Sequence, residues 1–414
     1  MNSPAQSNGS ADVVVIGGGP AGAALATFLQ RAGHHCVVIE RAAFPRYHIG
    51  ESLIPATYHT LDRLGLLPEL KFSDFPIKHS VRFVSPSGDE AEPFYFSDTI
   101  EGERAQTWQV ERSRFDQMCL DNARSSGVDV RMQTSVAQVL FENGRAVGVC
   151  ARPEDEESYD IYASVVVDAS GHATIIGSQL GLTVPVPALK KASIWTYYRG
   201  GKRGEGIDAG ETTVFMIPQR GWFWYIPLPD DIVSVGLVAS PEYLFAESKD
   251  FEAVLLRELN RCAPLAARLS QAVKTGPVRG TRRLAYRNQQ VVGDGWVMIG
   301  DAAAFLDPIY SSGLFLALAS AELAATSIHS ALDAEDVSAE RLGRFTRPLA
   351  QGVNVIYRLI QAFYDPNFSF REFTRRFPEQ RPALIDCLTG DVIEKDLSGF
   401  LEALAQLTPP PEPL

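Results

Sequence analysis

The 414-residue sequence predicts an α/β fold in which a parallel sheet, assembled from separated stretches of chain, is interleaved with an antiparallel sheet and followed by a helical C-terminal segment. Residues 12–40 have the hydrophobic pattern of a buried strand, a helix and a second strand, which is a βαβ unit. Continuously apolar strands of the same kind recur near 164–171 and 295–300. Residues 192–240 contain four strand-like stretches bounded by turn residues, as in an antiparallel sheet.

The composition excludes several classes of protein. Hydrophobic residues make up 45% and charged residues 21%, as in ordinary folded proteins. The net charge of −12 argues against binding to nucleic acid or anionic membranes. Five cysteines without a C-x-x-C pair predict neither a disulfide framework nor a zinc site, and no histidine spacing indicates a metal. A cytoplasmic protein whose mature chain starts near residue 1 is expected.

The remaining elements follow the hydrophobic pattern in chain order. Leucines at helical spacing predict one helix over 50–70, and alternation predicts strands within 78–96. We then expect a helix at 113–125, strands at 128–152, a helical stretch at 250–272, a helix at 313–332 and a helical, aromatic-rich tail from about 340. The Ala-rich stretch from 314 to 332 contains Glu322 and His329, so it is expected to be a core helix rather than a membrane span.

These elements predict three parts. The first is a discontinuous Rossmann-like nucleotide-binding domain, made of 10–75, 105–172 and 285–340. The second is a substrate domain built on the antiparallel sheet, made of 76–104 and 173–284. The third is a helical C-terminal segment, 341–414.

A dinucleotide signature lies in the first βαβ unit. Gly17-x-Gly19-x-x-Gly22 follows the first strand and opens the helix, and Glu40 ends the second strand. The glycines allow a tight turn, close approach of the backbone to a pyrophosphate and close helix packing, while the helix N-terminus supplies N–H donors. Glu40 is expected to accept a hydrogen bond from a ribose hydroxyl, and its charge disfavours a 2′-phosphate.

Further strand ends carry residues that favour FAD over NAD. Gly300-Asp301 and Asp168-Ala-Ser-Gly171 each end a predicted parallel strand. With the first signature they resemble the fingerprints of flavin monooxygenases related to p-hydroxybenzoate hydroxylase, and residues 110–116 (VERSRFD) are similar to the helix that supplies an arginine near FAD. The resemblance implies that FAD is bound by the glycine loop, Glu40, Arg46, Arg112, Gly300 and Asp301. No second G-x-G-x-x-G follows a strand, so reduced flavin is expected either from NAD(P)H bound transiently or from a separate flavin reductase.

Two motifs resemble those of the flavin-dependent halogenases. Trp222-x-Trp224-x-Ile226-Pro227 matches their W-x-W-x-I-P motif, and the segment Gly50-Glu51-Ser52-Leu-Ile-Pro resembles their G-E-S-x-x-P loop. The resemblance implies that reduced FAD (FADH2) and dioxygen form a C4a-hydroperoxide, which oxidises chloride or bromide to hypohalous acid. The two indoles would then keep the organic substrate away from the flavin. Ordinary strand packing is the competing explanation for these tryptophans.

The same family uses a lysine near the substrate. Lys78 opens a strand soon after the G-E-S loop and matches that position, whereas Lys71 is a rival in a more polar segment. In this role a lysine is expected in apolar surroundings that lower its pKa. The residues do not decide between a neutral amine that takes up halogen and a charged donor to hypohalous acid.

The motif Asp307-Pro-Ile-Tyr310-Ser-Ser312-Gly313 precedes a predicted helix. The resemblance implies that the N–H groups of Ser312 and Gly313 hold a halide. Tryptophan halogenases have a glutamate where this chain has Tyr310, so a phenol or pyrrole is the expected substrate, either free or tethered to an acyl carrier protein. Aromatic residues of the tail are weak candidates for covering the substrate together with Tyr310; they are Tyr357, Phe363, Tyr364, Phe368 and Phe370.

Three alternatives remain open at this stage. They are an NAD(P)H-dependent FAD aromatic hydroxylase, a flavin reductase of isoprenoid double bonds similar to geranylgeranyl reductase, and a non-catalytic flavin-binding protein. Arg279–Arg283 and Arg371–Arg376 are candidate docking surfaces for an acidic carrier protein, although a solvated charged face is the more common role of such stretches.

Overall fold

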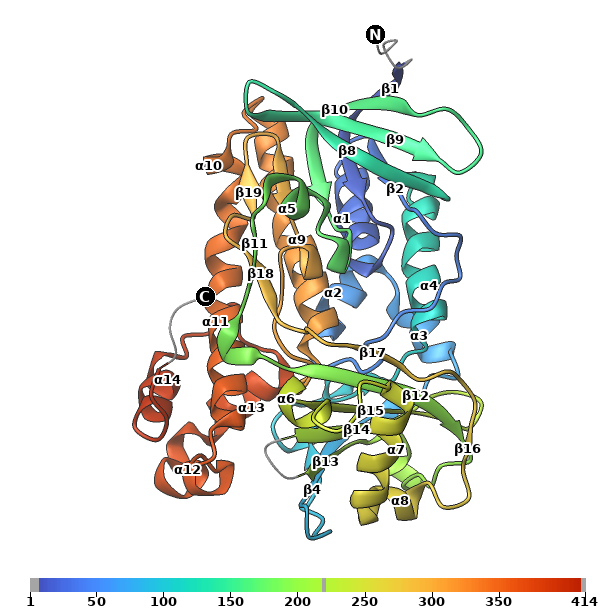
Figure 1. Ribbon diagram of the computed structural model, residues 1–414. Helices are drawn as coiled ribbons and strands as arrows, with labels where there is room; N and C mark the ends of the chain where they lie inside the picture. Colours follow the sequence, from blue (N-terminus) through green and yellow to red (C-terminus); the bar gives the residue numbers. More distant parts are fainter. Residues whose placement is uncertain (1–6, 218–220, 411–414) are drawn as a thin grey trace.

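The computed structural model describes residues 7–217 and 221–410, so the expected start of the chain lies outside the described residues. Two bodies lie one above the other in Figure 1, and the C-terminal helices run along one side of both. The upper body contains the first eight-stranded sheet, with strand order β19-β20-β10-β1-β2-β7 and with β8 and β9 attached to β10. Its strands are β1 (Ser7–Ile16), β2 (Cys36–Ile39), β7 (Asp129–Arg131), β8 (Thr134–Glu142), β9 (Arg145–Pro153), β10 (Tyr159–Asp168), β19 (Val292–Gly293) and β20 (Trp296–Met298).

The centre of this sheet is parallel, as the βαβ pattern predicts. β1 pairs with β2 and β10 in parallel, and β10 pairs with β20 in the same sense. Alternate residues of β1 face opposite layers: Val13 and Val15 pack with the helices α1 (Pro20–Arg31), α4 (Arg112–Ser125) and α9 (Ser312–Asp333), whereas Val14 and Ile16 pack with β8, β9 and α5 (Ile175–Leu180). Parallel strands joined through helices are the architecture that the sequence predicts for nucleotide binding.

Helix α9 is long and apolar enough to cross a membrane, and no other helix in the described part of the chain is. Sixty-seven per cent of its most apolar window is nevertheless buried inside the protein. Its alanines pack against those of α1 in the largest apolar cluster of the upper body. The expectation of a core helix therefore agrees with this packing.

The lower body is built on the second sheet, with order β16-β12-β15-β14-β13-β4-β5 and with β17 attached to β12. Its strands are β4 (Ser80–Val84), β5 (Phe94–Tyr95), β12 (Ala192–Arg199), β13 (Thr212–Ile217), β14 (Gly221–Pro227), β15 (Ile232–Ala239), β16 (Val273–Lys274) and β17 (Arg279–Thr281). The predicted sheet is present, but it is not wholly antiparallel. β13 pairs with β4 in parallel because β4 comes from a distant part of the chain and enters the sheet at that edge.

Side chains alternate across β14 and so separate two cores. Phe223 and Tyr225 face α7 (Phe251–Arg261) and α8 (Ala263–Arg268), which cover the outer face of the sheet. Trp222, Trp224 and Ile226 face the opposite way, toward the upper body and the C-terminal helices. Those helices are α11 (Thr346–Tyr364), α12 (Phe370–Arg376), α13 (Arg381–Thr389) and α14 (Ser398–Ala405), whereas α10 (Ala339–Leu342) packs in the core of the upper body. Period-two alternation thus places both motif tryptophans on the face that looks toward the upper body.

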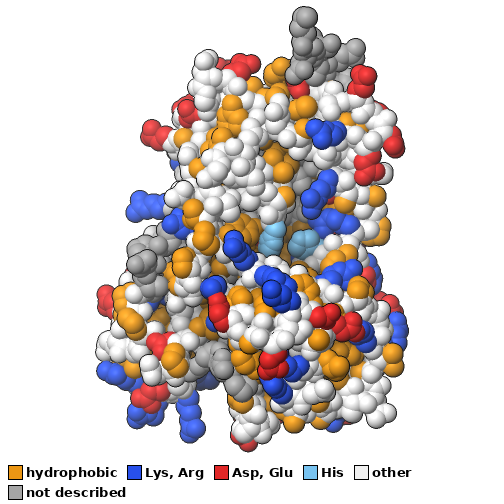
Figure 2. Space-filling model, in the orientation of Figure 1, with side chains coloured by type: hydrophobic (Ala, Val, Ile, Leu, Met, Phe, Trp, Pro, Cys, Tyr) orange, Lys and Arg blue, Asp and Glu red, His pale blue; other side chains and the backbone are white. Residues whose placement is uncertain are grey.

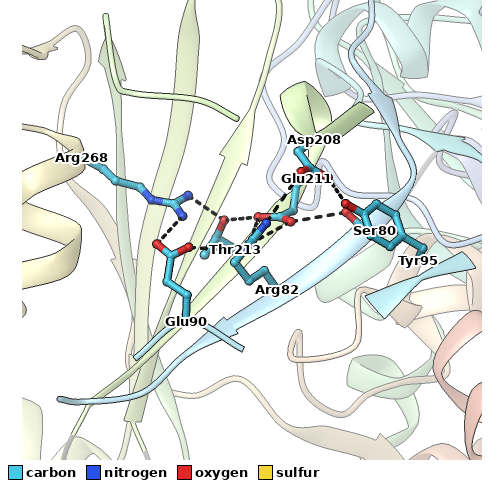
Figure 3. A network of polar contacts seen from close by, with 8 residues as sticks. All are labelled: Ser80, Arg82, Glu90, Tyr95, Asp208, Glu211, Thr213 and Arg268. Carbon is cyan, nitrogen blue, oxygen red and sulfur yellow. Dashed lines mark hydrogen bonds and ion pairs between the residues drawn. The ribbon is translucent and has the colours of Figure 1, made fainter. Parts of the chain in front are cut away.

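Polar contacts fix the edge of the second sheet where β4 joins it (Figure 3). Arg82 on β4 donates to Glu211 at 2.9 Å, and Glu211 also accepts from Ser80 at 3.4 Å. Arg268 at the end of α8 donates to Thr213 on β13 at 2.8 Å and to Glu90 at 3.2 Å. These contacts join β4, β13 and α8 across segments that are distant in the sequence.

The single helix expected over 50–70 is wrong. Residues 50–56 form a loop, followed by α2 (Thr57–Leu64) and α3 (Leu67–Phe72). Gly65 ends α2 in the left-handed conformation with φ +79, and Pro68 lies in the first turn of the next helix, so the leucine spacing spans two helices. Small sheets complete the fold: β3 (Ile77–Lys78) pairs with β6 (Thr107–Trp108), and β11 (Thr183–Pro185), β18 (Tyr286–Asn288) and β21 (Ala304–Phe305) form a three-stranded sheet.

Candidate active site

The glycine loop between β1 and α1 has the shape that a dinucleotide needs. Gly17 has φ +106, and a Cβ on Gly22 would lie 2.0 Å from the carbonyl oxygen of Gly17, so the turn and the helix contact each require glycine. A Cβ on Gly19 would meet only Arg46, whose Nη2 lies 3.3 Å away. The backbone is therefore open at Gly19, beside the N-terminus of α1 and a cation, which is a suitable place for a pyrophosphate.

Charged side chains at the end of β2 and on α4 border this loop. Glu40 is buried and accepts hydrogen bonds of 2.8 Å from the N–H groups of Gly18 and Ala42, so its carboxylate is fixed where the sequence places a ribose. Arg112 forms a bidentate pair with Asp116 and also donates to the carbonyl oxygen of Ile49 at 2.6 Å. It therefore holds the segment before the G-E-S loop against α4.

Arg46 lies 3.1 Å from the same Asp116 and so also holds this segment against α4.

The second fingerprint lies at the end of β20. Gly300 has φ +56, and a Cβ there would come within 3.3 Å of Ala21 and 3.4 Å of Ala317, so α1 and α9 converge at this point. Open glycine backbone, helix N-termini and two arginines form a donor set that fits FAD.

Asp301 follows Gly300, and burial raises the pKa of its carboxyl. Asp168 has a different environment from the one the fingerprint suggests, because its carboxylate accepts from the N–H groups of Ser170 and Ile176. Asp168 therefore shapes its own loop.

Lys78 is fully enclosed, with 1% of the residue exposed. Its Nζ donates to Ser52 Oγ at 2.9 Å and to the carbonyl oxygen of Leu53 at 3.0 Å. Burial lowers the pKa of Lys78 to about 7, because the charged amine loses its hydration. The rival Lys71 is partly exposed and forms an ion pair with Glu103, so the two lysines are in opposite environments.

The structure places uncharged polar groups around Lys78 together with the buried ring of Phe96, whose centre lies 5.6 Å from Nζ, whereas the sequence predicted apolar surroundings. Gln109 donates to Thr212 Oγ1 at 2.7 Å, and Thr212 lies 3.2 Å from Ser52 Oγ. Thr107 is opposite Lys78 in the β3–β6 pair. The hydroxyl of Thr107 and the amide oxygen of Gln109 are buried without a hydrogen-bond partner. These groups carry no charge, so the low pKa of Lys78 arises from burial alone.

The G-E-S loop reaches Lys78 because it runs as an extended segment beside residues 108–110. Ser52 forms an isolated antiparallel bridge with Gln109, and Leu53 N–H donates to the carbonyl oxygen of Trp108 at 3.1 Å. Pro55 ends this extended stretch before α2 begins. The motif therefore links the FAD-side helix α4 to the lysine.

Each indole of the W-x-W motif donates to a hydroxyl. Trp222 Nε1 donates to Tyr364 Oη at 2.9 Å, and Tyr364 donates to Asp307 Oδ2 at 3.0 Å. Trp224 Nε1 donates to Ser234 Oγ at 3.0 Å. The ring of Trp224 lies over Gly236 of the neighbouring strand, where a Cβ would come within 2.0 Å of the ring. Both indoles are therefore held in one orientation.

The hydroxyls that accept from the two indoles also contact buried carboxyl groups in motif loops. Ser234, the partner of Trp224, and Tyr197 both hydrogen-bond Glu51, and Tyr197 does so at 2.6 Å. Burial raises the pKa of Glu51 to about 7, and these two hydroxyls oppose the rise. Burial likewise raises the pKa of Asp307 to about 7, opposed by hydrogen bonds from Ile309 N–H and Tyr364. Both carboxyls therefore change protonation near neutral pH.

The predicted halide residues open helix α9. Ser312 and Gly313 are its first residues, and Ser311 before them has φ +54. Their N–H groups precede the first intrahelical hydrogen bond and carry the positive end of the helix dipole. Tyr310 is buried and donates to the carbonyl oxygen of Leu359 at 3.2 Å, so the residue that replaces the glutamate points toward α11.

Tyr357, Phe363 and Phe368 lie in the same apolar cluster as the motif tryptophans, and Tyr364 and Phe370 pack against that cluster. Sequence reasoning missed the roles of Tyr197, Ser234 and Asp307 and named Tyr364 only as a covering residue. Asp307 stood in the quoted motif, but Tyr197 and Ser234 gave no signal beyond polar residues within apolar strands.

One polar cluster lies outside this region. His34, His329 and Asp333 have potential ligand atoms within 4.8 Å of one another, a grouping that the sequence spacing does not indicate. His34 Nε2 and His329 Nδ1 are 2.8 Å apart. This is a hydrogen-bond distance, and it is shorter than the roughly 3.3 Å between two ligands of one tetrahedral zinc. The cluster is therefore a hydrogen-bonded histidine pair.

The chain is similar to known proteins over nearly its whole length. A family model described as tryptophan halogenase matches residues 12–105 and 90–372. A 1H-pyrrole-2-carbonyl-[peptidyl-carrier protein] chlorinase from Pseudomonas fluorescens is 30% identical over 96% of this chain and 92% of its own length. A tryptophan 2-halogenase from Chondromyces crocatus is 34% identical over 86% of this chain and 68% of its own length.

Among solved structures, a flavin-dependent brominase superposes with a TM-score of 0.86 at 28% identity, covering 96% of this chain and 98% of that chain. The family match spans both sheets and the motifs at Lys78, Trp222, Trp224 and Ser312. The chain therefore belongs to the tryptophan halogenase family, and it is a flavin-dependent halogenase.

Proposed function

We propose that this enzyme chlorinates or brominates an electron-rich aromatic ring, a phenol or a pyrrole, with Lys78 as the catalytic residue. The observation that carries the proposal is the environment of Lys78, which is buried, lacks a charged partner and is tied to the G-E-S loop by two hydrogen bonds. A structural surface lysine would have none of these features. The alternative Lys71 is solvated and paired with Glu103.

The flavin site is formed by the glycine loop, Glu40, Arg46, Arg112 and the Gly300–Asp301 turn. When bound, reduced FAD would supply two electrons to dioxygen, which is the oxidant that converts chloride or bromide into hypohalous acid, with the second oxygen atom leaving as water. The N–H groups of Ser312 and Gly313 would bind the halide at the N-terminus of α9. A separate flavin reductase would supply reduced FAD, since the glycine loop contains the chain's one G-x-G-x-x-G after a strand.

Lys78 would deliver the halogen to the ring. With a pKa of about 7, its charged form donates a hydrogen bond to hypohalous acid, and its neutral form has a lone pair that takes up halogen. Ser52 and the carbonyl oxygen of Leu53 orient Nζ in either form. The O–X bond of hypohalous acid breaks, and the proton that the ring carbon loses combines with the released hydroxide to form water, so no net charge accumulates.

Trp222 and Trp224 would keep the substrate away from the flavin. Their indoles are fixed by Tyr364, Ser234 and Gly236, so they cannot turn aside to admit a ring. The same apolar cluster excludes bulky molecules. A small electrophile is what such a barrier lets through.

A phenol or pyrrole is favoured over free tryptophan. Tyr310 stands where tryptophan halogenases have glutamate, and its hydroxyl is engaged with α11. Electron-rich rings react with electrophilic halogen when they are oriented, without a strong base. The chlorinase from Pseudomonas fluorescens takes its pyrrole on a peptidyl-carrier protein, which supports a tethered substrate here. Tyr357 and Phe363 would line the substrate pocket.

The parts defined from the sequence fit this division of labour. The discontinuous domain of 10–75, 105–172 and 285–340 would bind FAD, and 76–104 with 173–284 would form the substrate domain. The C-terminal segment 341–414 would cover the substrate. Such an enzyme would act in the cytoplasm, in secondary metabolism such as antibiotic biosynthesis.

The test is turnover with chemically reduced FAD, oxygen and a panel of phenols and pyrroles, with chloride and bromide in competition. Mass spectrometry should show products with halogen isotope patterns for the wild type and for Lys71→Ala, but not for Lys78→Ala. All three proteins should bind FAD equally. Halogenation retained by Lys78→Ala would remove the lysine from the mechanism, and hydroxylated products without halogen would make the protein an aromatic hydroxylase.

A further inference from the structure

A cluster of basic side chains lies between the two bodies, although the protein as a whole carries a net charge of −12. Residues 279–287 contain four arginines and no acidic residue. Arg282 and Arg283 are exposed on the connection between β17 and β18. In Figure 2 the surface is hollowed between the upper and lower bodies, and Lys and Arg side chains border this hollow.

This cluster is built onto the site rather than beside it. The N–H of Leu284 donates to the carbonyl oxygen of Lys191 at 3.2 Å, so the arginines run alongside the start of β12. Leu284 itself is buried in the apolar cluster that contains Trp222 and Trp224. Lys191 Nζ lies 3.8 Å from the ring centre of Tyr364, the residue that joins Trp222 to Asp307.

Arg279 makes the matching contact on the other side of the site. Its guanidinium lies 4.2 Å from the ring centre of Tyr47. Tyr47 is within 3.1 Å of the Tyr197 hydroxyl, which donates to Glu51 of the G-E-S loop. The half-buried cations Lys191 and Arg279 thus lead, within one or two side chains, to both buried carboxyls of the motif loops.

We propose that Arg279, Arg282, Arg283 and Lys191 form the docking surface for an acidic carrier protein that presents the aromatic ring on a flexible thioester arm. The inference rests on the proposed function and names its partner. Charge complementarity supports it, because an acidic partner would be repelled by the rest of this surface and steered to this cluster. An arm anchored here would enter between Tyr47 and Tyr364, at the face of the sheet that holds both tryptophans.

The other basic stretch, 371–376, also contributes Phe373 to the apolar cluster that contains Trp222 and Trp224, but its basic residues lie elsewhere on the surface. It lies on α12, at the bottom of Figure 1 and away from β17. Arg375 forms an ion pair with Glu372 on the same helix. It therefore provides a matched control with the same type of charge.

The experiment compares Arg282→Glu/Arg283→Glu with Arg371→Glu/Arg376→Glu. The probes are pyrrole-2-carbonyl loaded on an acidic peptidyl-carrier protein and the same acyl group as a free N-acetylcysteamine thioester. We expect kcat/KM for the carrier-bound probe to fall about 10-fold or more in the first variant, with a weaker dependence on salt. The free thioester should be halogenated at the wild-type rate by both variants, and the control should be unchanged with both probes.

Binding of the loaded carrier, measured by calorimetry without turnover, gives an independent readout and should weaken in parallel. Because Arg282 also stacks on Phe245, Arg283→Glu alone provides a second variant whose fold is not in question. Equal loss with both probes, or unchanged binding and turnover of the carrier-bound probe, would overturn the docking surface while leaving the halogenase intact. A wild type that halogenates neither probe would refute the proposed pyrrole chemistry and the docking surface with it.

Discussion

Replacing Lys78 by methionine should change how the stability of the protein depends on pH. Burial lowers the pKa of Lys78 from 10.5 to about 7. Between these values the unfolded chain binds a proton at Lys78 that the folded protein does not, so the free energy of unfolding rises with pH. The slope is about 1.4 kcal/mol per pH unit, and the whole window amounts to about 5 kcal/mol. Below about pH 7 both states are charged, and this cost of folding is constant.

Lys78→Met removes that cost and keeps a side chain of similar length. It also leaves the carbonyl oxygen of Leu53 without its hydrogen-bond donor, and this loss reduces the gain in the free energy of unfolding by about 1–3 kcal/mol. The variant should therefore be more stable than the wild type near pH 7 and should lose that advantage as the pH rises.

For a chain of this length the slope corresponds to about 1.5 °C in Tm per pH unit, or about 4 °C between pH 7 and 9.5. Calorimetric scans of both proteins at matched pH and scan rate measure the difference. Lys71→Met, which alters an exposed ion-paired lysine, should show no such trend. A Tm difference between Lys78→Met and the wild type that stays constant with pH would refute the reasoning.

Three further substitutions test the contacts of the site. Tyr364→Phe removes a hydrogen bond that lowers the pKa of Asp307, so the pH midpoint of tryptophan fluorescence should move above about 7. An unmoved midpoint would show that the Tyr364 hydroxyl does not influence the pKa of Asp307. Gly22→Ala places a Cβ 2.0 Å from a backbone oxygen, so FAD binding by fluorescence quenching should weaken at least 10-fold, and wild-type affinity would contradict the close approach. Gly236→Val should displace the Trp224 ring, abolishing halogenation while FAD binding persists; full activity would show that the ring orientation is unimportant.

Much of the fold and part of the site follow from local patterns. The βαβ unit, the Gly17–Gly22 loop and the position of α9 were predictable because each depends on residues close together in sequence. The break in the 50–70 segment was missed because leucine spacing continued across Gly65, whose left-handed conformation ends the helix. Turn chemistry outweighed periodicity there.

The partners of the site residues could not be predicted in the same way. Tyr364 is 142 positions from Trp222, and Thr212 is 160 from Ser52, so these contacts exist only after both bodies have formed. The parallel entry of β4 into the second sheet is of the same kind. Periodicity predicted a strand that opens at Lys78, whereas Lys78 ends the short strand β3 and the predicted strand is β4, which begins at Ser80. The uncharged surroundings of Lys78 depend on three distant segments.

The central claim is that oxidation of halide and transfer of halogen to the ring occur at different places, with Lys78 needed only for the second. The most direct measurement adds a diffusible trap for hypohalous acid, such as a cyclic diketone, to turnover of wild type and Lys78→Ala with reduced FAD, oxygen and bromide. The account predicts that the variant brominates the trap at close to the wild-type rate of halide oxidation while leaving the aromatic substrate unmodified. Loss of trap bromination in the variant, or bromination of the aromatic ring without Lys78, would contradict it.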